Sequence, residues 1–251
     1  MTGELIGVDV GGSGIKAASV DVATGVASGR IRVETPMPAT PAAIVATVAG
    51  LLARFPADGP FGCTLPAVVQ HGVVQTAAHI DPSWIGTHAV TMLSRTADRP
   101  CVVLNDADAA GIAEARYGAA RGHGGLVAMV TIGTGVGTAL LNDGVLVPNA
   151  ELGHIVVNRH VADDWVSDAA RLARNLSWKR WTRRLDRYLT HLHDVLWPDL
   201  IVIGGGIVKH ADRFCDRIDP GCEVRIAELG NLAGIVGAAA LAAAHIPAGT
   251  T

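Results

Sequence analysis

Polar residues end several apolar runs in this sequence, most clearly in the stretch VVLNDADAAGIAEARYG at 102–118. The run 102–104 stops at Asn105 and Asp106, and a second carboxylate follows at Asp108. An apolar run of this kind is typical of a strand covered on both faces, and such strands often present ligand-binding residues at their carboxyl ends. The alternative is that Asn105 and Asp106 turn the chain and cap a helix beginning near Ala109. For Asp108, turn geometry is a sufficient explanation.

A glycine-rich turn follows the first apolar run, 5–10. Its candidate phosphate-binding residues are Asp9, Gly11, Gly12, Ser13, Gly14 and Lys16. Glycine lets backbone N–H groups approach an anion closely, Lys16 adds a point charge, and Asp9 can orient a hydrated Mg²⁺. The turn is not a Walker A loop, because no Gly-Lys-Ser/Thr follows. It is also a poor dinucleotide fingerprint, because Ala17 stands where the third glycine belongs.

Two further glycine turns follow the apolar runs 126–132 and 200–203. Their candidate phosphate-binding residues are Thr131, Gly133, Thr134 and Gly135 in the second turn, and Gly204, Gly205 and Gly206 in the third, with Lys209 close behind. One such turn alone is weak evidence. Three of them, each behind an apolar run, favour a phosphate-binding protein.

The elements that position these residues alternate between strand-like runs and helical patterns, which predicts an α/β protein with open sheets. A chain of 251 residues suits one large domain or two associated lobes. The net charge of −3 gives no general electrostatic case for nucleic acid or an anionic membrane. The chain shows no secretory leader pattern and no apolar span of 18 residues, so we expect a soluble, cytoplasmic protein.

Three helical stretches are predicted. One spans 40–54, with Thr40 as cap and Pro41 in the first turn; a shorter one spans 109–117. The segment 164–197 is predicted as two helices divided at Ser177. The second of these carries an apolar stripe, expected in the core or in a subunit contact, made of Trp178, Trp181, Leu185, Tyr188, Leu192 and Val195.

The motifs GVDVGGSGIK, VLNDADAAGIAE, TIGTGVGTAL, PNAELGH and DLIVIGGGIVK occur in the order found in the ROK family of sugar kinases. The sequence resembles, more narrowly, the polyphosphate/ATP-dependent glucokinases of actinobacteria, from about Ile6 to Ala244. The resemblance implies an actin-like (ribonuclease H-like) ATPase fold with two lobes around a cleft. The small lobe would hold residues 1–107 with a returning C-terminal helix at about 232–246, and the large lobe residues 108–231. Homodimers are frequent in the family, so a homodimer is implied too.

The resemblance also implies an activity: phosphorylation of glucose to glucose 6-phosphate, with Mg²⁺ and with polyphosphate, ATP or both as donor. Asp106 would be the general base on the 6-hydroxyl, and Asn105 would bind neighbouring hydroxyls. Glu151 and His154 match the family's sugar-binding pair. No cysteine lies between Cys101 and Cys215, so the zinc motif of many ROK kinases is expected to be absent.

Four positions depart from the subgroup. Ala67 stands where glycine is usual, His79 where asparagine is usual, and Arg159 where glycine is frequent. Asp163 replaces a glutamate that helps hold the sugar. Because hydrogen-bonded sugar sites discriminate sharply when a partner moves, the hexose range is open, with mannose or glucosamine beside glucose. Neutral drift is the alternative explanation.

A run of basic residues crosses the two predicted helices of 164–197: Arg171, Arg174, Lys179, Arg180, Arg183, Arg184 and Arg187. Of these, Arg180, Arg183, Arg184 and Arg187 occupy one helical face away from the apolar stripe. The plain interpretation is the solvated face of an amphipathic helix. The functional hypothesis is a cationic track for the tail of a long polyphosphate.

Three rivals to a polyphosphate-using kinase follow from the same resemblance. ROK repressors carry an N-terminal helix-turn-helix, for which a first phosphate strand beginning by Leu5 leaves no room. A sugar-binding protein with impaired turnover is motivated by the altered sugar positions. A plain ATP-dependent hexokinase of shifted specificity is the third. Turnover compared with that of Asp106→Asn distinguishes a working kinase from a binding protein.

Overall fold

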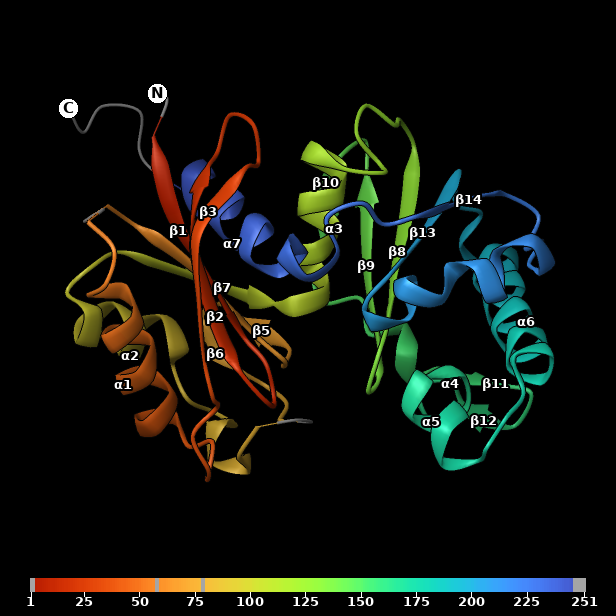
Figure 1. Cartoon of the computed structure of the whole chain (residues 1–251), viewed down its shortest axis with the longest axis horizontal. Helices are drawn as coiled ribbons and strands as arrows, with labels where there is room; N and C mark the ends of the chain where they lie inside the picture. The colour runs from red at the N-terminus through yellow and green to blue at the C-terminus, as the bar shows by residue number, and fades with distance from the viewer. Residues whose placement is uncertain (1–2, 57–58, 78–79, 246–251) are drawn as a thin grey trace. The chain divides into compact units, whose positions relative to one another are not determined.

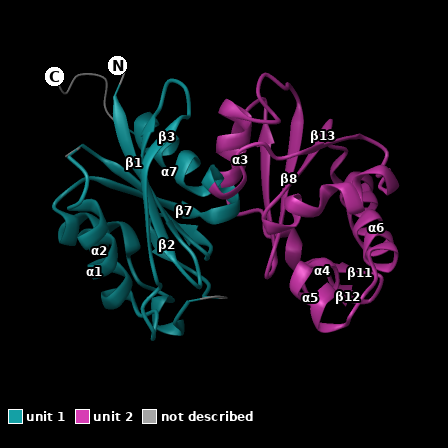
Figure 2. Cartoon of the chain, in the orientation of Figure 1, with its two compact units in different colours: residues 1–109, 232–251 teal, residues 110–231 magenta. Residues whose placement is uncertain are grey.

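The chain forms two compact units (Figure 2), one of residues 1–109 with 232–251 and the other of residues 110–231. The computed structural model describes residues 3–56, 59–77 and 80–245. Each unit contains a five-stranded mixed sheet and its own helices, which confirms the predicted α/β class. No helix in these described ranges is long and apolar enough to cross a membrane.

The sheet of the first unit has the strand order β3-β2-β1-β4-β7 (Figure 1). Its strands are β1 (Glu4–Val10), β2 (Ile15–Asp21), β3 (Ala27–Val33), β4 (Phe61–Leu65) and β7 (Cys101–Asn105). The first three pair antiparallel, whereas β1, β4 and β7 run parallel, so the carboxyl ends of those three meet at one edge. Strand β7 is an edge strand of this sheet, and both α2 (Ala89–Ala97) and α7 (Ala233–Ala244) contact it. Leu104 is buried, whereas Cys101–Val103 are half-buried.

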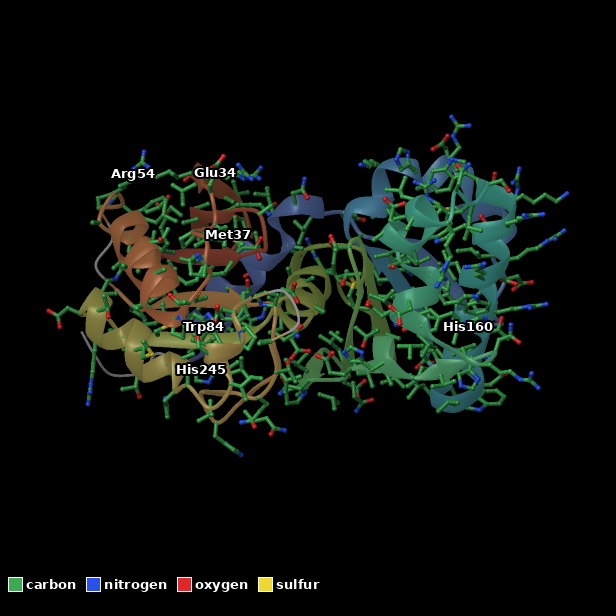
Figure 3. The ribbon with its side chains drawn as sticks, turned by 90° about the horizontal axis from the view of Figure 1, so that it is seen from below. Glu34, Met37, Arg54, Trp84, His160 and His245 are labelled. Atoms are coloured by element: carbon green, nitrogen blue, oxygen red, sulfur yellow. The ribbon has the colours of Figure 1, made fainter. Side chains whose placement is uncertain are left out.

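The helices of this unit follow from local signals. Helix α1 (Pro41–Leu52) begins where predicted, because the Thr40 hydroxyl accepts the N–H of Ala43. Trp84, labelled in Figure 3, stands in the short helix η1 (Pro82–Trp84) and is fully buried. Its indole N–H donates to the carbonyl of Ala39 at 3.0 Å. The other elements are α2 (Ala89–Ala97), α7 (Ala233–Ala244) and the strand pair β5 (Val69–Gln70) and β6 (Val73–Val74).

The second unit's sheet has the order β10-β9-β8-β13-β14. Its strands are β8 (Leu126–Ile132), β9 (Val136–Asn142), β10 (Val145–Val147), β13 (Leu200–Gly204) and β14 (Glu223–Ile226). Strands β8, β9 and β10 are antiparallel neighbours, and β8, β13 and β14 run parallel. A small pair, β11 (Val156–Val157) and β12 (His160–Val161), precedes the helices.

Two helix predictions need correction. Helix α3 (Asp106–Tyr117) begins three residues before the predicted start at Ala109, because Asn105 already supplies its cap. The segment 164–197 forms three helices, not two, because Ser167 caps a helix as Ser177 does, its hydroxyl accepting from Ala170. They are α4 (Ala162–Val166), α5 (Asp168–Ala173) and α6 (Trp178–Leu196). The remaining short helices are η2 (Leu152–His154), η3 (Gly206–Arg213), η4 (Cys215–Arg217) and η5 (Gly230–Leu232).

Helix α6 is amphipathic, as the stripe predicted. Its apolar face enters the core of the second unit through Trp181, Leu185, Tyr188 and Leu192. The stripe ends one turn early, however, because Val195 is 64% exposed.

Candidate active site

The carboxyl edge of the first sheet carries Asn105 and Asp106. Asp106 is exposed and is the first residue of α3, with its Oδ1 accepting the N–H of Ala107 at 2.9 Å. The Asn105 amide is buried instead: its Oδ1 accepts from Ala107 at 2.7 Å, and its Nδ2 donates to the carbonyl of Ala67 at 3.4 Å. Both explanations offered by the sequence therefore have a basis, since Asn105 caps the helix while Asp106 presents a carboxylate.

Asp108 lies inside the first turn of α3 rather than in a loop. Its side chain is only 2% exposed, and its N–H donates to Oδ1 of Asn105 at 3.3 Å. The expectation that turn geometry accounts for Asp108 is therefore corrected to a buried helical position. Its burial separates it from the exposed Asp106, so the two carboxylates have different environments despite their spacing.

The first glycine turn closes the hairpin between β1 and β2. The N–H of Gly11 donates to the carbonyl of Gly14 at 3.1 Å, and the Thr35 hydroxyl donates to the carbonyl of Gly11 at 2.6 Å. Arg32 donates to the carbonyl of Ser13 at 2.9 Å. Gly12 and Ser13 stand at the exposed tip of this turn. The side chains of Thr35 and Arg32 thus fix the backbone of this turn, while its tip is exposed to solvent.

Asp9 sits at the centre of a polar cluster one residue before the end of β1. Its Oδ2 pairs with Lys16, directly opposite on β2, at 3.0 Å, and its Oδ1 accepts from the Thr64 hydroxyl at 2.9 Å. The carboxylate is 16% exposed. Burial, followed by the charge of Asp9, raises the pKa of the neighbouring Cys63 thiol far above its usual range, so this thiol stays neutral.

The second and third glycine turns lie side by side in the second unit. Gly204 pairs with Thr131 across the parallel strands β8 and β13. Gly205 has a φ of +80°, and a Cβ there would come within 2.5 Å of the Ile132 carbonyl oxygen, so only glycine fits. Thr134 and Lys209 are exposed near the two turns. The second and third glycine turns thus follow neighbouring strand ends, with Thr131 half-buried and Thr134 exposed.

Asp163 braces the second glycine turn. One of its carboxylate oxygens accepts the N–H of Val136, and the backbone N–H groups of Asp168 and Ala169 donate to the carbonyl of Gly133 at 3.0 and 3.3 Å. The chain therefore uses this carboxylate to hold the loop, a contact that the sequence did not predict.

Glu151 and His154 come together on η2. Their side chains approach to 3.4 Å between Oε2 and Nε2, and the His154 side chain is 64% exposed. The turn is fixed by Gly153, where a Cβ would lie 2.1 Å from the Val136 carbonyl oxygen. Tyr188 also holds it, donating to the carbonyl of Leu152 at 3.3 Å. Glu151 and His154 therefore lie close in space as well as in sequence, beside the second glycine turn.

The positions that depart from the subgroup fall in different places. Ala67 is buried, with its carbonyl bonded to Asn105. Arg159 has a φ of +65°, a left-handed conformation that costs glycine little, which accounts for the residue usual there. His79 lies outside the described residues.

Sequence reasoning missed the supporting side chains. Thr64 is fully buried at the end of an apolar strand, and a polar residue in such a run was the available signal. Glu114 is 1% exposed and accepts the N–H groups of Ala119, Glu228 and Leu229, which ties the loop before η5 to α3. Nothing in the local pattern marks Glu114, because its partners lie far along the chain.

Comparison with known proteins gives consistent relatives. The sequence profile of the ROK family matches residues 5–166. The polyphosphate glucokinase of Mycobacterium tuberculosis is 44% identical over 235 residues, which cover 93% of this chain and 89% of that protein.

Solved structures agree with these relatives. The inorganic polyphosphate/ATP-glucomannokinase of Arthrobacter sp. strain KM superposes with a TM-score of 0.92 at 45% identity, covering 97% of this chain and 99% of that one. A ROK glucokinase of Streptomyces griseus, solved with glucose and AMPPNP, gives a TM-score of 0.83 at 25% identity over 96% of this chain and all of that one. These likenesses confirm the predicted actin-like, two-lobed ATPase fold.

Proposed function

The chain belongs to the ROK family, and on that premise we propose that it is a hexose kinase that phosphorylates glucose on its 6-hydroxyl, with inorganic polyphosphate or ATP as donor. The observation that carries the proposal is its identity of 44–45% to a polyphosphate glucokinase and a polyphosphate/ATP-glucomannokinase over nearly the whole chain. The exposed carboxylate of Asp106 supports it independently. Relatives of this kind do not favour the repressor or the impaired binding protein.

In the proposed reaction Asp106 accepts the proton of the sugar hydroxyl. The hydroxyl oxygen bonds to the terminal phosphorus as the bond from that phosphorus to the bridging oxygen of the donor breaks, and the shortened donor leaves with the bridging electron pair. A general base must be ionised to act, and the position of Asp106 at the first residue of α3 favours its anionic form. Asn105, whose amide is committed to Ala67 and the helix cap, would then act chiefly by fixing Asp106.

Phosphoryl transfer by kinases uses Mg²⁺, and the cluster around Asp9 fits a hydrated ion. The Asp9 oxygens accept from Lys16 and Thr64, and a carboxylate oxygen has a further lone pair for a metal-bound water. Asp9 would hold the ion through water, and the ion would neutralise charge on the transferred group. Lys16 and the amides of Gly12 and Ser13 would bind the same phosphates.

The second unit would supply uncharged donors to the phosphates. Backbone N–H groups of 134–135 and 204–206, with the Thr131 and Thr134 hydroxyls, form the proposed cradle, and Lys209 adds a charge. Gly133 would shape this turn, since its N–H donates to the Gly135 carbonyl at 2.9 Å. Glu151 and His154 would bind sugar hydroxyls. Asp163 would act on the sugar only indirectly, because its carboxylate holds Val136. We include mannose as a second hexose, since the glucomannokinase is a relative at 45% identity. A cytoplasmic homodimer without nucleic-acid or membrane partners completes the proposal.

The test is production of glucose 6-phosphate by the purified protein with Mg²⁺, comparing polyphosphate and ATP as sole donors. Turnover with polyphosphate is the expected result. Turnover with ATP alone would leave a plain ATP-dependent hexokinase. Glucose binding without product from either donor would overturn the kinase proposal in favour of a sugar-binding protein.

A further inference from the structure

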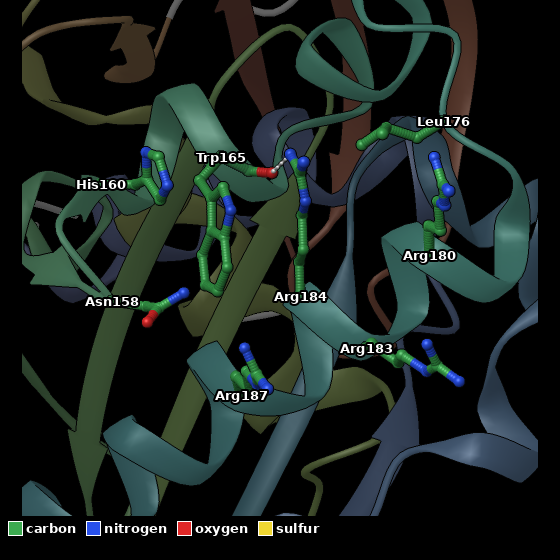
Figure 4. A pocket seen from close by; sticks show the side chains of 8 residues that line it. All are labelled: Asn158, His160, Trp165, Leu176, Arg180, Arg183, Arg184 and Arg187. Atoms are coloured by element: carbon green, nitrogen blue, oxygen red, sulfur yellow. Dashed lines mark hydrogen bonds between the residues drawn. The ribbon is translucent and has the colours of Figure 1, made fainter.

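Four arginines of α6 line a groove of about 470 Å³ that lies wholly within the second unit (Figure 4). The lining residues are Arg180, Arg183, Arg184, Arg187, Asn158, His160, Trp165 and Leu176. Within the described part of the chain, Arg184 alone of these arginines hydrogen-bonds to the groove wall, donating to the carbonyl of Trp165 at 3.4 Å (Figure 4). Of the residues that the structure describes, none lining this groove is acidic.

The positive charge of the groove is uncompensated. Among the described residues no carboxylate lies within 4.0 Å of any of the four guanidinium groups, whereas nearby Arg171 pairs with Asp168 at 2.7 Å. Burial, and then the charges of Arg174 and Arg180, lower the pKa of Arg184. Like charges gathered at one surface repel, so a bound anion would stabilise this arrangement. Guanidinium groups bind phosphate oxygens in pairs and are the preferred phosphate ligands among cationic side chains.

The shape of the hollow suits a chain rather than a single phosphate. Arg187 follows Arg180 by seven positions, which is about 10 Å along a helix. A second hollow of about 420 Å³ continues past Arg187, shares Asn158 with the first, and reaches Thr190 and His191 before it meets Asp194. The cationic path is thus elongated along α6 and ends at a negative charge.

We propose that this arginine groove binds the tail of inorganic polyphosphate, beyond the end that donates its phosphoryl group. The inference rests on the proposed function and extends it to a second subsite for the donor. The groove wall is also connected to a phosphate loop. Helix α4 contributes Trp165 to the groove, and two residues earlier Asp163 holds the N–H of Val136 in the second glycine turn.

The groove favours a bare polyanion over a nucleic acid. Single-stranded nucleic acids are held by bases stacked on exposed aromatic rings as well as by cations. Here Trp165 is 4% exposed and its ring stacks on His160 at 5.5 Å, so it offers no free face for a base. Phosphate recognition by arginine remains as the chemistry of the groove.

The experiment compares the double variant Arg180→Gln/Arg187→Gln with the control Lys179→Gln/Arg217→Gln. Both remove two exposed cations from the second unit, and the control residues lie outside the groove. For each protein we would measure KM for long-chain polyphosphate, tripolyphosphate and ATP at several salt concentrations. Direct binding of long-chain polyphosphate and of single-stranded polyuridylate would be measured in parallel.

The groove variant is expected to raise KM for long-chain polyphosphate about tenfold, and to reduce the slope of log KM against log salt by about 1.5, as loss of two phosphate contacts predicts. KM for tripolyphosphate and ATP should change less than about twofold, since neither reaches beyond the transfer site. The control should match the wild type. Equal effects on ATP and long-chain polyphosphate, or equal effects of the two double variants, would overturn the proposal.

Direct binding separates this inference from the proposed function. If the wild type uses only ATP, the donor assignment fails, yet weaker polyphosphate binding by the groove variant alone would still support the groove. Unchanged binding in that variant would overturn it. Tighter binding of polyuridylate than of polyphosphate at equal charge, lost in the groove variant, would replace polyphosphate by RNA as the occupant.

Discussion

The two units carry the same sheet with different chemistry at matching positions. In both, three antiparallel strands are followed by two parallel ones, and a glycine turn joins the first two strands in sequence. In the first unit Asp9 faces Lys16 on one neighbouring strand and Thr64 on the other. The equivalent of Asp9 in the second unit is Thr131, which faces Gly137 and Gly204.

The difference shows how one backbone can serve two purposes. A polar triad fills the strand ends of the first unit, where Lys16 and the Thr64 hydroxyl both donate to the Asp9 carboxylate. In the second unit the facing residues Gly137 and Gly204 have no side chains, and the Asp163 carboxylate fixes the turn by accepting the N–H of Val136. In the proposed reaction the first unit would therefore present charges to the donor, and the second would present backbone amides. We expect substitutions in the first unit to affect chemistry most and those in the second to affect loop order and binding.

The largest effect is expected at Asp106, the exposed carboxylate of the first unit. Asp106→Asn should lower kcat about 10²- to 10⁴-fold, because the amide cannot accept the hydroxyl proton. Glucose binding and the unfolding midpoint should stay close to wild type, since Asn also fits a helix start. Steady-state kinetics with either donor, together with calorimetry of glucose binding, measure both. A kcat within twofold of wild type would remove Asp106 from the mechanism.

A matched pair of substitutions tests the comparison itself. Asp9→Asn should lower kcat about 10²-fold, because Lys16 and the proposed Mg²⁺ lose their carboxylate partner. Thr131→Val, at the equivalent strand position, should cost less than about tenfold, because one neutral hydrogen bond is lost there. Both are measured as kcat at saturating donor over a range of Mg²⁺ concentrations. Equal losses at the two positions would break the proposed division between charged and neutral units.

The contact of Asp163 with the second glycine turn leads to a prediction about stability. Asp163→Ala should lower the free energy of unfolding by about 1–3 kcal/mol, because the N–H of Val136 loses its acceptor. KM for both donors should rise while kcat changes less. Urea unfolding and donor titrations measure these, with Asp163→Glu as the control that keeps the carboxylate. A rise in KM for glucose alone would instead place Asp163 at the sugar.

The smallest expected effect is on the pH dependence of folding stability, and it should differ between a thiol of the first unit and one of the second. Burial raises the pKa of Cys63, so in the folded state it stays protonated above its ordinary value of 9.0. The thiol of the unfolded chain ionises above pH 9.0, whereas the folded one does not. The free energy of unfolding should therefore be unaffected by this group below pH 9.0. Above it, that free energy should fall by up to about 1.4 kcal/mol per pH unit for one thiol. Cys63→Ala should flatten the decline measured by urea unfolding between neutral and alkaline pH. Cys222→Ala, at a half-buried thiol of the second unit, should flatten it less.

Much of the fold was predictable because its signals are local. The runs ending at Val10, Ile132 and Ile203 are strands, the last extending one residue further to Gly204, and Thr40 and Ser177 cap helices as expected. The predicted helix boundaries were wrong where a second capping residue lay close to the one that was predicted. Asn105 took the cap and started α3 early, and Ser167 added a helix boundary that the periodicity of its neighbours concealed.

The candidate site divides in the same way. Residue types and spacing singled out Asn105 with Asp106 and Asp9 with Lys16 as candidates, because each pair is close in sequence, and the family resemblance added Glu151 and His154. Contacts across many residues were invisible: Thr64 reaches Asp9 over 55 positions, and Leu229 reaches Glu114 over 115. The role of Asp163 as a brace belongs to this second class.

The sequence by itself determined where strands end, which glycines turn the chain, and which carboxylates and cations stand beside those turns. It could do so because strand runs, caps and glycine turns depend on neighbours a few residues away. Only the tertiary structure decided that Asn105 is a buried cap while Asp106 is open, and that Asp163 holds a loop. It also gathered the arginines of α6 around one groove beside Trp165. The burial of a side chain, its hydrogen-bond partner and the charges around it depend on which distant segments pack together. The spacing of residues along the chain does not specify that packing.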